Sequence, residues 1–289
     1  KENQEMNKLI SAFILFTAIF VQAEKGDCFQ VLHNMNLSLP VLIDVHDNGS
    51  GTGVFINSDK GLFLATAGHV LYRKDDKGRD YLIGKNLTLT AYTAGNELTK
   101  FIVDLQELSK GNNFKYDSAN DVAIIRLLQW NNTAEAEKGT KIEAIPEKDH
   151  FGAIPLDFKN GRPTSGIRYF KDVGVSNNVY ILGYPTSLSY KDVMFERDRP
   201  LVRKGIVAGK YPKQKRIILD CPVYHGNSGG PVLIEDGDKV VPIGIVTQLI
   251  PLVEEWKNSI YGISNLSITN SGYSVVIPMD FIVDLVSQF

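Results

Sequence analysis

Gly226-Asn227-Ser228-Gly229-Gly230-Pro231 is the stretch of the sequence that bears most directly on both the fold and the chemistry. It lies between two short apolar runs, 216–219 and 232–234, so the serine is expected on a turn between two strands. Glycines on both sides leave the hydroxyl exposed, and their N–H groups can approach a reacting carbonyl closely. For this segment alone, a glycine-rich hairpin turn without chemistry is the alternative.

On both sides of this stretch, short apolar runs recur along the whole chain and are separated by turn residues. About a dozen such runs without interleaved amphipathic helices indicate an all-β protein, built as an antiparallel sandwich or a pair of barrels. The expected strands are 41–45, 53–56, 62–67, 87–92, 101–105, 121–128, 179–182, 201–207, 216–219, 232–234, 240–248 and 273–277.

A short packed helix is expected at the C-terminus. Phe281, Ile282, Leu285 and Val286 share one face at helical spacing, and Asp280 before them is the expected N-cap. The polar stretches 73–80, 108–120 and 129–150 are expected to be surface loops.

Composition excludes several classes of protein. With 43% hydrophobic and 22% charged residues the chain is an ordinary globular protein, which excludes disorder and fibres. Its 31 basic and 33 acidic side chains give a formal charge of −2, and no basic run provides a phosphate-binding footprint. Nucleic acid is therefore not an expected partner.

The N-terminal region has the pattern of a targeting segment. Lys8 precedes an uncharged apolar stretch, 9–21, which closes on the small residue Ala23. This predicts a signal peptide over 6–23, cleaved after Ala23, and an exported mature chain, 24–289, in the periplasm or outside the cell. A membrane anchor, the alternative, needs about 20 apolar residues, so no stable anchor is expected after cleavage.

Two further segments carry candidate catalytic side chains. Ala65-Thr66-Ala67-Gly68-His69-Val70 places a histidine at the end of an expected strand, where a structural histidine is the alternative. Asn120-Asp121-Val122-Ala123-Ile124-Ile125 places an aspartate at the head of an apolar strand, where a strand-entry aspartate is the alternative. Burial would raise the pKa of that carboxyl unless a hydrogen bond favours its charged form.

The order His69, Asp121, Ser228 is one of the few known for an acyl-transfer triad. With the three motifs quoted above, the sequence resembles the chymotrypsin-like serine peptidases. More narrowly it resembles the bacterial HtrA-like and glutamyl-endopeptidase branch, through 179–185, 205–207 and 276–278 as well. The resemblance covers roughly 40–289.

This resemblance implies a single peptidase domain of two six-stranded antiparallel β-barrels, approximately 40–165 and 166–279, with the site between them. Ser228 would be the nucleophile, His69 the general base and acid, and Asp121 the group that orients the imidazole. The backbone N–H groups of Gly226 and Ser228 would form the oxyanion hole. Protein or peptide substrates are implied, with no cofactor and no metal.

By the family pattern, the primary specificity pocket would be lined by residues from three segments. They are Pro222, Val223, Tyr224, His225, Thr247, Gln248, Leu249 and Ser274. No aspartate falls at the pocket base, which argues against a preference for Lys or Arg. Val246 stands where glutamyl endopeptidases have a histidine, which argues against strict acidic preference, although His225 at the rim leaves this open.

Asn227 departs from the digestive members of the family. There the residue before the serine is an aspartate that pairs with a newly cut N-terminal ammonium. An uncharged amide cannot form that ion pair, so activity is expected without a specific new N-terminus.

The sequence has three alternatives to a chymotrypsin-like enzyme. The serine segment also fits an α/β-hydrolase elbow, but no histidine follows Ser228 as that fold requires. A subtilisin-like arrangement would use Asp44 or Asp47 before His69, but the alternating helices of that fold are lacking. The third is a catalytically silent chain of the same fold that binds partners.

The remaining histidines and the cysteines carry weaker signals. His33, His46 and His150 show no metal-ligand spacing. Cys28 and Cys221 allow either one bridge or two thiols, with a small buried hydrophobe as the simplest role of Cys221. Neither this choice nor the oligomeric state follows from the sequence.

Overall fold

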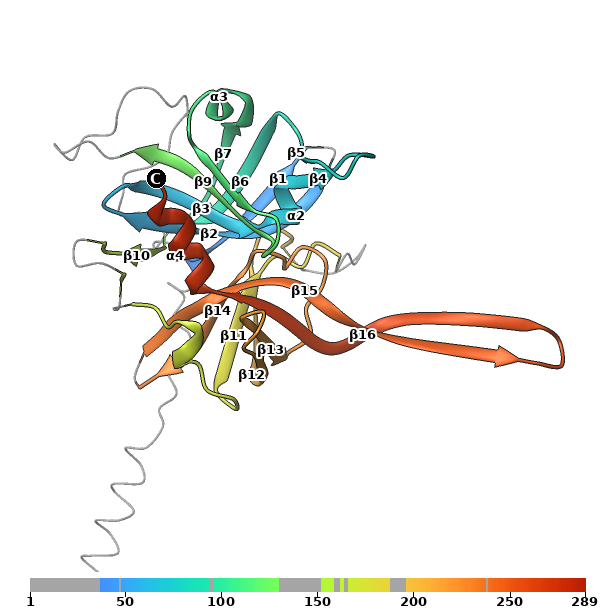
Figure 1. The fold of residues 1–289 in the computed structure, drawn as a ribbon. Helices are drawn as coiled ribbons and strands as arrows, with labels where there is room; N and C mark the ends of the chain where they lie inside the picture. The colour runs from blue at the N-terminus through green and yellow to red at the C-terminus, as the bar shows by residue number, and fades with distance from the viewer. Residues whose placement is uncertain are drawn as a thin grey trace, which may run out of the picture. The chain divides into compact units, whose positions relative to one another are not determined.

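The computed structural model describes 37–46, 48–93, 96–129, 152–158, 162–163, 166–187, 196–237 and 239–289. All of these residues belong to the unit Asn34–Phe289. The predicted signal peptide, Cys28, His33 and His150 lie outside the described residues, as does most of the expected loop 129–150. The described part contains two large β-sheets, a small two-stranded sheet and a C-terminal helix (Figure 1).

The first sheet contains eight strands. Seven run in the order β7-β6-β1-β2-β3-β9-β8, and β10 pairs in parallel with β2. Their bounds are β1 Pro40–Val45, β2 Gly49–Ser58, β3 Gly61–Ala67, β6 Asn86–Tyr92, β7 Leu98–Asp104, β8 Phe114–Asp117, β9 Val122–Gln129 and β10 Ala153–Leu156.

This sheet differs in detail from the expected six-stranded barrel. β8 lies in a stretch that was expected to be a loop, and it pairs antiparallel with β9 because its backbone extends beside that edge. β10 adds a second unexpected strand, and pairing among the described strands does not close the sheet into a ring. The all-β, chymotrypsin-like class with a short C-terminal helix is confirmed.

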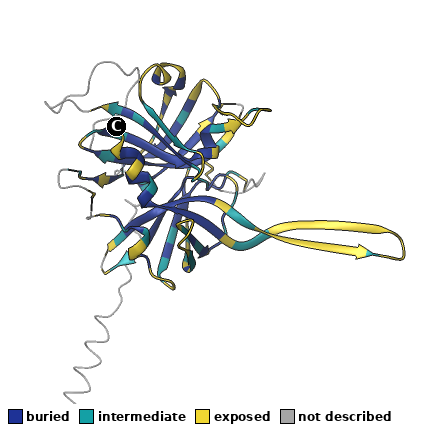
Figure 2. Cartoon of the chain, viewed as in Figure 1, coloured by how far each residue is buried: buried dark blue, intermediate teal, exposed yellow. Residues whose placement is uncertain are grey.

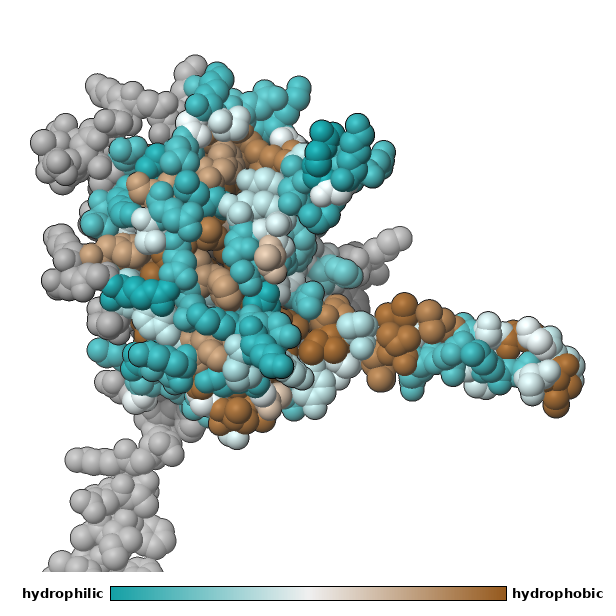
Figure 3. Space-filling model, viewed as in Figure 1, coloured by the Kyte–Doolittle hydropathy of each residue, from teal (hydrophilic) through white to brown (hydrophobic). Residues whose placement is uncertain are grey.

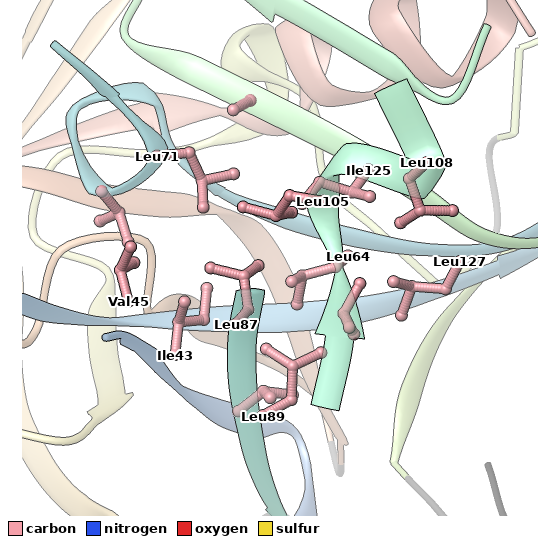
Figure 4. Packing of buried hydrophobic residues seen from close by; sticks show 14 of the residues in the cluster. Ile43, Val45, Leu64, Leu71, Leu87, Leu89, Leu105, Leu108, Ile125 and Leu127 are labelled. Atoms are coloured by element: carbon pink, nitrogen blue, oxygen red, sulfur yellow. The ribbon is translucent and has the colours of Figure 1, made fainter. Parts of the chain in front are cut away.

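Alternating side chains form the core of the first sheet. Val41, Ile43 and Val45 of β1 are at most 1% exposed, as are Leu87 and Leu89 of β6. Figure 4 shows Ile43, Val45, Leu87 and Leu89 together with other members of the same cluster, among them Leu64, Leu105 and Ile125. Successive side chains of a strand point to opposite faces, so every second residue of β1 and β6 enters this core.

The second sheet is a closed barrel in the order β11-β12-β13-β16-β15-β14. Its strands are β11 Asn178–Gly183, β12 Leu201–Tyr211, β13 Arg216–Asp220, β14 Pro231–Asp236, β15 Lys239–Asn258 and β16 Ile263–Pro278. Val179, Ile181, Leu219 and Ile243 are fully buried inside it. The predicted six-stranded second barrel is therefore confirmed.

Helix α4, Met279–Ser287, packs against both sheets. Its Ile282 and Val286 share one buried cluster with Ile56 of the first sheet and Ile277 of the barrel. The helix thereby fixes the two sheets relative to each other, and the predicted terminal helix is confirmed.

The predicted cap of this helix was wrong. Pro278 occupies the N-cap position without a side-chain hydrogen bond, because the helix begins two residues earlier than expected. Asp280 lies inside the first turn, where its Oδ2 accepts a hydrogen bond of 2.7 Å from the Phe170 N–H. A carboxylate in this turn is also favoured by the helix dipole.

The remaining elements are short. They are α2 Gly68–Leu71, β4 Tyr72–Lys74, β5 Asp80–Leu82, α3 Leu105–Ser109 and the 3₁₀ turn η2 Phe170–Asp172. β4 and β5 pair with each other in a stretch expected to be a loop. No described helix has the length and apolar character needed to cross a membrane.

Candidate active site

His69 is presented by the turn that follows β3. The single-turn helix α2 carries it, and Gly68 gives this turn room, because a Cβ there would lie 2.4 Å from Cε2 of Tyr116. Tyr116 stacks on Tyr72 with 4.1 Å between ring centroids, and burial raises the pKa of Tyr72 to about 12. The His69 side chain is 47% exposed, so the imidazole is accessible.

Asp121 holds His69 at two points. It immediately precedes β9, as predicted, with a left-handed φ of 57°. Its Oδ1 accepts a hydrogen bond of 2.8 Å from the His69 backbone N–H, and its Oδ2 lies 2.8 Å from His69 Nδ1. The Gly68 N–H also donates to the Asp121 carbonyl at 2.9 Å. With Nδ1 facing the carboxylate, Nε2 is the ring nitrogen left for proton transfer.

Ser228 lies on the loop between β13 and β14. Two backbone hydrogen bonds hold this loop: the Thr52 N–H donates to the Ser228 carbonyl at 2.8 Å, and the Gly229 N–H donates to the Val246 carbonyl at 2.6 Å. The Ser228 hydroxyl donates to the carbonyl of Thr247 at 3.1 Å. Among the described hydrogen bonds, none joins Ser228 Oγ to His69.

The turn before the serine contains two backbone amide donors, those of Gly226 and Ser228. Gly226 has φ of +97°, and a Cβ there would lie 2.2 Å from the Tyr184 carbonyl oxygen. The turn is closed by Asn227, whose N–H donates to the Tyr224 carbonyl at 3.0 Å and whose Oδ1 accepts from the Tyr224 N–H at 3.2 Å. Within the described chain, the N–H groups of Gly226 and Ser228 donate to no other group. They remain available for an anionic oxygen.

Thr52 is a site residue that sequence reasoning missed. Its buried hydroxyl donates to the Gly226 carbonyl at 2.6 Å and accepts from the Tyr184 N–H at 3.0 Å. This fixes the orientation of the peptide that follows Gly226. The available signal was the glycine-rich run 49–53 inside a strand, which marks close approach of another segment.

Comparison with known protein families decides the family. The model of the trypsin-like peptidase domain matches residues 51–243, more than half of the chain. The chain belongs to this family. The predicted resemblance is confirmed, and the comparison with curated proteins gives no match.

The chain is also similar to solved structures of other proteins. The Deg5 structure is 17% identical, with a TM-score of 0.50, and the match covers 89% of this chain and 91% of that one. The serine endoprotease from Yersinia pestis is 15% identical with a TM-score of 0.48, and the HtrA-type protease AlgW is 14% identical with a TM-score of 0.47.

The matches with the Yersinia pestis protease and with AlgW cover most of this chain but a smaller share of those proteins. The match with the Yersinia pestis protease covers 88% of this chain and 65% of that one. The match with AlgW covers 87% of this chain and 60% of that one. The chain thus spans less than two thirds of the length of these two proteases.

The residues expected to line a specificity pocket differ in exposure. His225 and Gln248 are exposed, and Tyr224 is half-buried with the Arg203 guanidinium 4.5 Å from its ring centroid. Thr247 is 3% exposed, and its carbonyl accepts the Ser228 hydroxyl bond.

The other two predicted pocket residues are more enclosed. Leu249 packs against the barrel core. Ser274 is fully buried, and its hydroxyl donates to the Cys221 carbonyl at 3.0 Å. Its side-chain bond is therefore directed into the barrel backbone.

The weaker sequence signals fall away from this site. Cys221 is 1% exposed, and burial raises the pKa of its thiol. His46 contacts Thr88 Oγ1 at 2.9 Å through its Nε2. In the described ranges, no group of three or more His, Cys, Asp or Glu side chains is arranged to hold a metal.

Proposed function

We propose that this trypsin-like peptidase is an exported serine endopeptidase that works through an acyl-enzyme intermediate. The observation that carries the proposal is the two-point contact between Asp121 and His69. It orients a half-exposed imidazole with Nε2 free, which is the arrangement a general base requires.

The first step requires a change of rotamer at Ser228. Its hydroxyl leaves the Thr247 carbonyl by rotation about χ1 and donates instead to His69 Nε2. The Oγ then bonds to the substrate carbonyl carbon while its proton passes to Nε2, and the Asp121 carboxylate stabilises the imidazolium.

The negative charge that develops on the substrate oxygen would be received by the N–H groups of Gly226 and Ser228. Neither group has to give up a protein hydrogen bond to do so. His69 returns the proton to the leaving amine as the C–N bond breaks. A water molecule, deprotonated by the same imidazole, then releases the acyl group and restores Ser228.

The turn 224–227 also supports activity without cleavage of a zymogen. Asn227 is 2% exposed and closes the turn through its own side chain and backbone. No ion pair with a new N-terminus is needed to hold it. An engineered N-terminal extension should leave activity unchanged, and activity appearing only after its removal would refute this.

Substrate preference and location complete the proposal. The mature chain would be 24–289, exported to the periplasm or the medium after removal of 6–23. Because no carboxylate stands among the proposed pocket residues, Lys or Arg at the cleavage site is disfavoured.

The second candidate is a catalytically silent protein of the same fold that binds polypeptides. One observation favours it: the Ser228 hydroxyl bonds to the Thr247 carbonyl instead of to His69. If that rotamer were permanent, the serine would not be activated.

A fluorophosphonate probe separates the two candidates without knowledge of the substrate. The mature protein and a Ser228→Ala control are exposed to the probe, and the adduct is located by peptide mass. Labelling of Ser228, slowed in His69→Ala, is expected. Folded protein that stays unlabelled would refute the endopeptidase and favour the binding protein.

A further inference from the structure

The barrel carries a long two-stranded projection, which we call the arm and define as residues 250–272. It consists of the distal parts of β15 and β16, paired from Pro251 with Asn270 to Asn258 with Ile263. Figures 1 and 2 show it extending from the barrel with exposed residues along its length. An isolated two-stranded ribbon is only marginally stable in water, so the arm gains stability from whatever covers it.

The arm exposes apolar side chains on both of its faces. Val253, Ile268 and Leu266 share one face, as their cross-strand register requires. Figure 3 shows hydrophobic surface along the arm. Within the arm, the apolar residues that are at least 46% exposed are Leu252, Val253, Trp256, Ile260, Tyr261, Ile263, Leu266 and Ile268.

The two edges of the arm differ in how they are protected. The β15 edge carries Pro251, Glu254, Glu255 and Lys257, and proline and charges are the devices that block pairing with another strand. The β16 edge, 263–270, reads Ile-Ser-Asn-Leu-Ser-Ile-Thr-Asn, without charge, proline or glycine. No other strand in the described ranges pairs with it there. This edge is open to pairing.

We propose that two copies of this chain pair through the β16 edges of their arms, antiparallel about a two-fold axis, to form a four-stranded sheet. Such a contact sets one strand against itself, so any charge near the axis would meet a like charge. The uncharged β16 edge avoids that repulsion. Pairing through β15 would instead bring Glu254 and Glu255 close to their own copies.

The side chains also select a register. Residues that face each other in antiparallel strands lie on the same face of the sheet. With the axis at Ser267, Leu266 of each copy faces Ile268 of the other. An axis at Leu266 or Ile268 would set apolar residues against Ser264 or Asn270.

A pair of cysteine variants tests this register. Ser267→Cys places two thiols across the axis, where Cα atoms of facing residues are roughly 4.5–5.5 Å apart and a disulfide can form. Ser264→Cys is the matched control, because both serines are exposed and the two copies of position 264 would be about 20 Å apart. Mild oxidation should link Ser267→Cys into a dimer, with the bond located at position 267, and should leave Ser264→Cys and the parent chain unlinked.

Sedimentation equilibrium tests the association itself. The parent should dimerise, and Ile268→Glu should weaken the dimer at least about tenfold. Ile102→Glu, which changes an exposed isoleucine on the edge strand β7, should leave the dimer unchanged.

Three results would overturn the proposal. They are a parent that stays monomeric up to about 100 μM, equal linking of the two cysteine variants, and equal weakening by the two glutamate variants. A monomer whose arm instead binds phospholipid vesicles would assign the arm to a membrane surface and would equally refute the dimer.

Discussion

Replacing Gly226 by alanine tests whether the turn before the serine is built for its N–H group. The new Cβ would lie 2.2 Å from the Tyr184 carbonyl oxygen and 2.5 Å from the Thr186 backbone nitrogen, at a φ of +97°. Both neighbours are backbone atoms, so neither can move out of the way as a flexible side chain would. Strain and crowding therefore act together at this position.

The cost can be estimated from these two effects. Left-handed strain costs about 1–2 kcal/mol, and overpacking about 1–3 kcal/mol, or roughly 2–5 kcal/mol together if the turn stays in place. If the turn moves instead, the Gly226 N–H leaves its position. Loss of one oxyanion donor lowers the rate about 10²- to 10³-fold.

The assay combines the rate of fluorophosphonate labelling with thermal denaturation. Gly78→Ala is the control, since Gly78 has φ of +75° and a Cβ there would meet nothing within 4 Å. The Gly78→Ala variant has the backbone strain of a positive φ without crowding of the new Cβ, so it should keep the labelling rate of the parent. A Gly226→Ala variant that labels within about threefold of the parent would refute this account of the turn.

Three further outcomes are expected. Thr52→Val keeps the side-chain volume but leaves the Gly226 carbonyl and the Tyr184 N–H without their partner, which lowers the stability by about 1–3 kcal/mol for each group. The melting temperature and the labelling rate should both fall. A change in neither would contradict the role of Thr52. Asp121→Asn should lower turnover by up to about 10⁴-fold, as in related triads, with little loss of thermal stability, and full turnover would contradict the proposed orienting role. Because burial raises the pKa of Cys221, less thiolate forms in the folded state at pH 8 than in the unfolded chain; iodoacetamide should modify it only after denaturation, as read by peptide mass, and rapid modification of folded protein would contradict its burial.

The sequence was sufficient to predict the fold class, the second barrel and the local settings of His69, Asp121 and Ser228. These depend on short motifs whose residues are neighbours in the chain. Thr52 could not be found in this way, because its partner Gly226 lies 174 residues away and only the folded chain brings them together. The rotamer of Ser228 is likewise decided by a carbonyl on β15.

The arm escaped prediction for a different reason. The expected strands ended at 248 and began again at 273, whereas β15 reaches Asn258 and β16 begins at Ile263. A strand with one buried face alternates apolar and polar residues, but the arm has no buried face. The stretch around Pro251 therefore lacks the alternation that predicts a strand.

The ladder of the arm also makes its length adjustable. Each rung takes one residue from either strand, as in the pair Val253 and Ile268. Removing both members of a rung shortens the hairpin and leaves the pairing of the barrel intact. Small deletions or insertions placed evenly about the turn can thus change the reach of the molecule over evolution, while Thr247 and Ser274 keep their positions.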